Sequence, residues 1–116
     1  APFNYEGGRE AAKVLLSDDG PKPTAIFACS DQQAIGVLRV AFDRRIAIPG
    51  ELSVVGFDGI LVSDLVVPRV TTAVQPVASI ARCATDLLIG GEALDASASH
   101  IFPCAMALRE TCAPPR

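Results

Sequence analysis

Three polar side chains that follow predicted strands are the sequence's strongest candidates for a chemical role. Ser30, Asp58 and Gln75 each come directly after a short run of apolar or β-branched residues. In a parallel α/β sheet the carboxyl ends of the strands share one edge, and ligands bind at that edge. A hydroxyl, a carboxylate and an amide suit the hydroxyls of a sugar or the edge of a heterocycle. The three positions therefore predict a crevice that binds a small molecule, with Asp58 as the leading contact.

Each of these residues also has a purely local interpretation. Ser30 has capping-box spacing with the glutamine three residues on, so it would cap a helix. Gln75 precedes a proline and would likewise act as a cap, and Asp58 precedes a glycine and would form a turn. Asp31 is interpreted as a first-turn charge that complements the helix dipole rather than as a ligand contact.

Residues suited to catalysis or metal binding do not gather anywhere in the sequence. His100 lies in a polar segment and is interpreted as a surface residue. No glycine-rich phosphate loop, nucleophile elbow or metal-ligand spacing occurs. The four cysteines, at positions 29, 83, 104 and 112, form no C-x-x-C pair and are interpreted as reduced structural residues of a cytoplasmic protein. We expect no enzyme, no metal and no cofactor.

The order of the predicted elements explains how the three polar positions would meet. Amphipathic periodicity predicts helices over residues 5–16, 31–44 and 77–88. Apolar runs predict strands at 24–29, 52–57 and 70–74, with further strand pieces at 101–103 and 105–108 and a loop at 92–99. This alternation is typical of βα units, so we predict an α/β fold with a parallel sheet.

Length and composition exclude several classes of protein. A chain of 116 residues, half of them apolar, is enough for one modest domain with a sizeable core. The net charge is -3 and the basic residues are scattered, which argues against direct contact with nucleic acid. No apolar stretch reaches about 18 residues, so no membrane span is expected. The N-terminal residues also lack the basic and apolar regions of a signal peptide.

Four segments resemble the effector-binding core of the LacI/GalR family of bacterial transcriptional regulators. They are PTAIFACSDQQAIGVLRV, IPGELSVVGFDGI, PRVTTAVQP and PCAMALRETC, in the family's order and spacing. The resemblance implies a type I periplasmic-binding-protein-like fold, in which two α/β lobes hold an effector in the cleft between them. It assigns residues 1–69 and 101–116 to the C-terminal lobe, and residues 70–100, a strand plus a helix, to the N-terminal lobe.

The resemblance also implies roles for particular residues. In this family the residue before Asp31, the aspartate that ends the G-F-D strand and the glutamine of T-T-x-x-Q contact the effector, typically a sugar or a purine. These positions are Ser30, Asp58 and Gln75. Ser30 departs from the family's usual asparagine, and a hydroxyl replaces an amide that both donates and accepts.

Two further features of the family concern assembly. Its members form homodimers through the helix at 31–44 and the segment before Pro68. The expected interface here consists of Ile35, Leu38, Leu65 and Val66, together with Val67 of the same apolar run. For Leu38 a place in the core is the alternative interpretation. The family's helix-turn-helix, hinge and opening lobe have no counterpart here, so we expect a C-terminal fragment that holds one wall of the cleft. Operator DNA would be bound only through the missing N-terminal domain.

The leading interpretation is therefore the effector-sensing and dimerising part of a cytoplasmic transcriptional regulator. The alternative is an exported sugar-binding protein of an ABC-type transporter, which shares the fold and the G-F-D strand. The P-x-V-T-T-x-x-Q-P segment and the R-E-T ending favour the regulator. A flavodoxin-like receiver or nucleotide-binding enzyme is a third class, but it would need a phosphate-cradling loop or an acidic pocket, and the sequence shows neither.

Overall fold

The computed structural model describes residues 1–90 and 99–114. Helices and strands alternate over most of this range, which confirms the predicted α/β pattern. The elements are α1 (Tyr5–Leu15), β1 (Ala25–Phe27), α2 (Asp31–Asp43), β2 (Ser53–Asp58), α3 (Val62–Leu65), β3 (Thr71–Val74), α4 (Val77–Ile89) and β4 (Ala105–Ala107). The short helix α3 lies where the sequence predicts no element. Most of the predicted loop at 92–99 lies outside the described residues.

The four strands form one sheet in the order β1-β2-β3-β4. β1 pairs in parallel with β2, and β2 with β3, so the carboxyl ends of these three strands share an edge. β4 returns antiparallel to β3. The predicted strand at 105–108 is therefore present, whereas residues 101–103 are not a strand. The sheet is mostly parallel, as the sequence predicts, but the antiparallel β4 makes it mixed.

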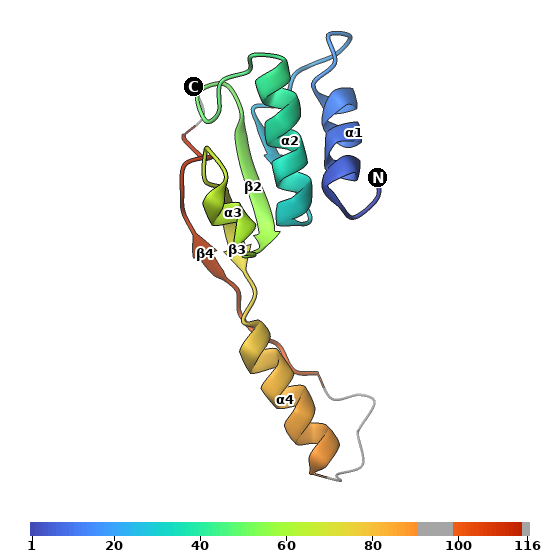
Figure 1. The fold of residues 1–116 in the computed structure, drawn as a ribbon, viewed down its shortest axis with the longest axis vertical. Coiled ribbons are helices and arrows are strands. Elements are labelled where there is room, and N and C mark those ends of the chain that lie inside the picture. The colour runs from blue at the N-terminus through green and yellow to red at the C-terminus, as the bar shows by residue number, and fades with distance from the viewer. Residues whose placement is uncertain (91–98, 115–116) are drawn as a thin grey trace.

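The pairing of β3 corrects one boundary in the predicted lobe division. Residues 70–100 were assigned as one piece to a separate lobe, but β3 is hydrogen-bonded to β2 within the same sheet. That boundary is wrong for this strand. Among the described residues, α4 projects from the end of β3, with His100 and Phe102 of the returning segment beside it (Figure 1). α4 contains no buried residue, and the molecule has an elongated shape of 56 × 25 × 23 Å. The assignment of α4 to a second lobe stays a prediction.

Helices α1 and α2 pack side by side, and α2 also packs against β2 of the sheet (Figure 1). Two glycines permit their close approach, because a Cβ on Gly8 would lie 2.2 Å from the Gln33 carbonyl oxygen and one on Gly36 would lie 2.3 Å from that of Tyr5. The core beneath the helices consists of Ala12, Leu16, Ile26, Ala28, Ala34, Val37, Leu38, Val40, Ala41, Leu52, Val54 and Val70. Among the described residues, no helix is both long and apolar enough to cross a bilayer.

Candidate functional site

The carboxyl edge of the sheet brings Asp58 and Gln75 into direct contact. Asp58 is the last residue of β2, and Gln75 directly follows β3. Gln75 Nε2 donates a hydrogen bond of 2.6 Å to Asp58 Oδ1, and the Gln75 backbone N–H donates one of 3.2 Å to the Asp58 carbonyl oxygen. Both residues are half-buried. Of the three positions that the sequence predicts to converge, the structure joins these two by hydrogen bonds. Their role as effector contacts stays a prediction. Gln75 is not a helix cap, because α4 has no side-chain cap.

The backbone at this edge turns sharply out of the sheet. Asp58 has a φ of 112° and Gly59 a φ of 77°, both in the region that favours glycine. Glycine is tolerated there at little cost, whereas an aspartate is held there only by its surroundings. The Asp58 carboxylate thus leaves the sheet on a strained turn.

Ser30 lies at the same edge but in a different environment. Its hydroxyl accepts a hydrogen bond of 3.2 Å from the Gln33 backbone N–H and caps α2, and the residue is only 3% exposed. Within the residues that the structure describes, no hydrogen bond joins Ser30 to Asp58 or Gln75. The structure thus shows the capping role and leaves the hydroxyl proton of Ser30 free for another partner.

Asp31 lies in the first turn of α2, as the sequence predicts, but it also makes contacts that the sequence interpretation missed. It is fully buried, and its carboxylate accepts hydrogen bonds from the backbone N–H groups of Gly59 and Ile60 and from the hydroxyl of Thr72. A first-turn charge beside solvent would need none of these partners. One signal was available: a glycine inside a strand often marks the close approach of another group, and a Cβ on Gly56 would lie 2.3 Å from Asp31 Oδ1.

The predicted dimer residues differ in exposure. Leu38 is 8% exposed and belongs to the core, as its alternative interpretation proposed, while Ile35 and Val66 are partly buried against the same core. Leu65 is widely exposed. More exposed still are Val67 of the same predicted run, at 92%, and Phe42, which lies outside the predicted set, at 76%.

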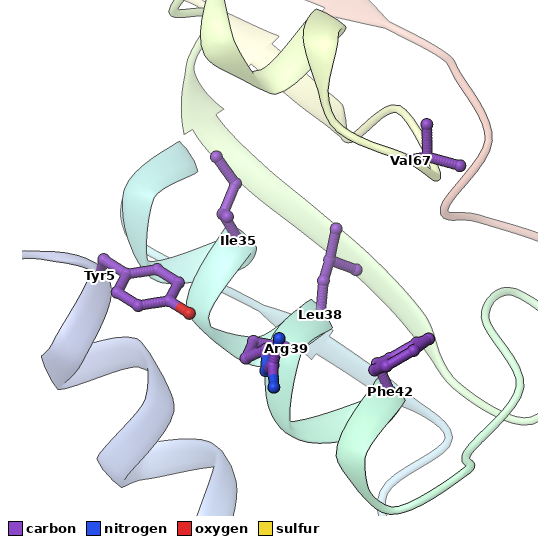
Figure 2. Close-up of a pocket in the computed structure, with 6 residues that line it drawn as sticks. All are labelled: Tyr5, Ile35, Leu38, Arg39, Phe42 and Val67. Carbon is purple, nitrogen blue, oxygen red and sulfur yellow. The ribbon is translucent and has the colours of Figure 1, made fainter.

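A surface hollow of about 310 Å³ lies between α1, α2 and the segment after α3. Figure 2 shows its lining residues, which are Tyr5, Ile35, Leu38, Arg39, Phe42 and Val67. Four of them come from α2, and Val67 reaches over from the segment before Pro68. The periodicity of the sequence marks Phe42 only as one of the apolar positions of this helix. Periodicity alone does not say where the buried face of a helix ends, so it does not predict that Phe42 is exposed.

Arg109 fixes the segment that carries Leu65 and Val67. Its guanidinium donates hydrogen bonds of 2.9 Å to Ser63 Oγ and to the Val70 carbonyl oxygen, and it forms a 3.1 Å ion pair with Asp64. The interaction joins α3 to the beginning of β3 and to the C-terminal segment. The arginine of the R-E-T ending therefore has a structural explanation.

Next to it, an exposed ion pair joins Glu110 to Arg69. The Arg69 backbone N–H donates a 2.8 Å hydrogen bond to the carboxylate, and the guanidinium adds one of 3.1 Å. The backbone hydrogen bond first, and then the guanidinium, hold the pKa of the Glu110 carboxyl below its usual range. The ionised Glu110 therefore holds the C-terminal segment most firmly to Arg69, just before β3.

The chemistry of the edge is recognition by hydrogen bonds. Within the described residues, Asp58 Oδ2 and Gln75 Oε1 accept no hydrogen bond, so an oxygen of each remains open to a hydroxyl donor. In the same part of the chain, no three histidine, cysteine or acidic side chains come together as a metal site. The four cysteines are free thiols.

Comparison with known proteins identifies the family of this chain. The sequence profile of the "Periplasmic binding protein-like domain" matches residues 2–112. The regulator GalS of Salmonella typhimurium is 41% identical over 108 residues, which are 91% of this chain and 32% of GalS, so the chain spans about a third of that relative.

Two solved structures have the same fold. A LacI family transcriptional regulator from Arthrobacter, in complex with lactose, superposes with a TM-score of 0.83 at 29% identity, over 95% of this chain and 42% of that one. A LacI family transcriptional regulator from Enterococcus faecium, with bound ribose, superposes with a TM-score of 0.81 at 25% identity, over 98% of this chain and 42% of that one. This chain therefore belongs to the periplasmic binding protein-like domain family, in the branch of the LacI/GalR-type transcriptional regulators.

Proposed function

We propose that this chain is the effector-sensing part of a bacterial DNA-binding transcriptional regulator, and that its effector is a sugar. The observation that carries the proposal is the hydrogen-bonded pair of Asp58 and Gln75 at the carboxyl edge of the sheet. It is supported by related regulators whose structures contain lactose and ribose. Relatives named as transcriptional regulators favour this function over an exported transport protein.

The pair has the chemistry that a polyhydroxylated ligand requires. A carboxylate accepts hydrogen bonds from two adjacent hydroxyls, and these charge-assisted bonds are stronger than neutral ones. The Gln75 amide adds a donor and an acceptor, which matches a hydroxyl that both donates and accepts. A purine would use the same groups for fewer hydrogen bonds. Ser30 is the third proposed contact, through its hydroxyl proton.

The same proposal includes a homodimer formed through α2 and the segment before Pro68. The apolar side chains on this face are exposed, Phe42, Leu65 and Val67 above all, and such a patch is typical of a protein interface. Two copies related by a two-fold axis would bury it against itself. Leu38 and Ile35 would support the surface from beneath.

The remaining functions of the regulator would lie outside this chain. Operator DNA would be bound by an N-terminal domain, and the effector would be enclosed by a second lobe to which α4 belongs. Because α4 has no buried residue here, packing against another lobe would give its apolar side chains a partner. Effector binding would then shift the closure of the lobes and the geometry of the DNA-binding heads. Such a regulator acts in the cytoplasm.

A reporter gene placed under a promoter whose operator the complete protein binds tests this function. We expect Asp58→Ala in the complete protein to abolish the response to the effector while operator binding in a gel-shift assay persists. Asp43→Ala, on the exposed end of α2, is the matched control and should respond normally. Normal effector response in the Asp58 variant would refute the proposed contact.

A further inference from the structure

We propose that Asp31 is a positioning residue for the Asp58–Gln75 pair. The inference rests on the proposed function of that pair as the effector contact and adds a residue that does not touch the effector itself. Asp31 is the first residue of α2 and is fully buried. Its carboxylate controls the backbone on both sides of the pair.

The contacts of Asp31 reach both strands that carry the pair. Oδ2 accepts hydrogen bonds of 2.9 Å from the Gly59 N–H and 2.8 Å from the Ile60 N–H, the two residues that directly follow Asp58. Oδ1 accepts a hydrogen bond from the hydroxyl of Thr72, which lies on β3, three residues before Gln75. One carboxylate therefore fixes the turn after β2 relative to β3.

The sheet provides a dedicated place for this carboxylate. Gly56 of β2 lies opposite Thr72 of β3 in the strand register. A Cβ on Gly56 would come within 2.3 Å of Asp31 Oδ1, so only glycine leaves room for it. A buried carboxylate is costly unless its oxygens are fully hydrogen-bonded, and here two donors from the turn after β2 and one from β3 satisfy them.

The backbone of Asp58 explains why this position needs support. With a φ of 112°, Asp58 holds a conformation that a non-glycine residue keeps only when neighbouring interactions fix it. The two N–H groups held by Asp31 belong to the turn that this conformation begins. If the Asp31 carboxylate were lost, the turn would relax and the Asp58 side chain would swing away from Gln75.

The decisive experiment is nitrogen-15 NMR of the protein expressed from its complete gene, without any sugar. Two variants remove the interaction: Asp31→Asn, whose amide no longer accepts all the donors, and Thr72→Val, which deletes only the hydroxyl. We expect backbone amide exchange of Gly59 and Ile60 to accelerate about tenfold or more. The Gln75 side-chain amide resonances should move to the position of free glutamine amides, while the amide of Val54 in the core stays protected.

Matched variants separate positioning from general stability. Asp43→Asn makes the same change at the exposed end of α2, and Thr72→Ser keeps the hydroxyl, so both should give the parent spectrum. The proposal is overturned if the Gln75 side-chain signals stay in place when the Gly59 and Ile60 amides are released, or if neither changes. If Asp31→Asn does not fold, Thr72→Val decides by the same signals. Because no sugar is added, a failure here is distinct from a failure of the sugar-binding proposal, which would leave these spectra as expected.

Discussion

The amide nitrogen of Gln75 lies 2.6 Å from Oδ1 of Asp58, although the two residues are 17 positions apart in the chain. Parallel pairing of β2 with β3 sets Asp58 opposite Val74, the residue before Gln75. The amide therefore meets the carboxylate at the strand ends, and among the described residues an oxygen of each side chain accepts no hydrogen bond. A ligand rich in hydroxyl groups is the natural partner of this arrangement.

Replacing the amide of Gln75 by a second carboxylate should make stability depend on pH. In Gln75→Glu two carboxylates lie within hydrogen-bond distance, so the folded-state pKa of the pair rises above the unfolded value. A raised folded-state pKa contributes stability below the unfolded pKa, and that stability is lost as pH rises through the folded pKa. We expect Gln75→Glu to be less stable than the parent by about 1 kcal/mol at pH 7 and to recover toward pH 5.

Thermal unfolding at the two pH values measures this effect. Gln32→Glu is the control, because its exposed side chain lies in the first turn of α2, where a negative charge is favourable. Equal pH profiles for the two variants would contradict the close contact of Asp58 and Gln75.

A methyl group on Gly56 should be costly. The added Cβ would collide with the buried Asp31 carboxylate at 2.3 Å, and neither β2 nor α2 can move away without breaking other contacts. We expect Gly56→Ala to lower the free energy of unfolding by about 1–3 kcal/mol, as overpacking of a core does. Gly20→Ala, where a Cβ meets no atom within 4 Å, should be nearly neutral. Denaturant unfolding of the Gly56→Ala and Gly20→Ala variants measures the difference. Equal midpoints would argue against the close packing of Asp31 on Gly56.

A charge on the exposed face of α2 should weaken self-association. Phe42 is 76% exposed, so Phe42→Glu leaves the core intact and places an unpaired charge in the proposed interface. We expect the dimer dissociation constant to rise at least about tenfold. Val14→Glu, at an equally exposed apolar site on α1, should not change it. Sedimentation equilibrium measures both variants, and a parent protein that is monomeric at every concentration would contradict the proposed dimer.

Acid should weaken the attachment of the C-terminal segment. Hydrogen bonds from the Arg69 backbone N–H and guanidinium lower the pKa of Glu110 from its usual 4.5 in the folded state. A lowered folded-state pKa gives stability that is present above the unfolded pKa and lost as pH falls through the folded value. We therefore expect Glu110→Gln to show a flatter fall in stability below about pH 4.5. Glu10→Gln on α1 is the control, and an identical acid profile for Glu110→Gln and the parent would contradict the ion pair.

The sequence predicted those features that depend on local patterns. Apolar runs located the three parallel strands within a few residues, and polar residues at their ends identified Asp58 and Gln75 as neighbours. The division at residue 70 was wrong because strand pairing is a long-range property that the apolar run of β3 does not encode. The role of Asp31 was hidden for the same reason, since its donors lie 28 to 41 positions away. The exposure of Phe42 could not be predicted either, because it depends on how α2 packs against the sheet.

The most direct test of the account is equilibrium binding of sugars to the complete protein and its Asp58→Asn variant. A calorimetric panel of pentoses, hexoses and disaccharides should include ribose, lactose and sucrose. We predict that the parent binds at least one of them, and that Asp58→Asn weakens this binding by about 10- to 100-fold, because a charge-assisted hydrogen bond is lost. Asp43→Asn should bind as the parent does. Equal affinity in the Asp58→Asn variant, or no sugar bound by the parent, would contradict the account.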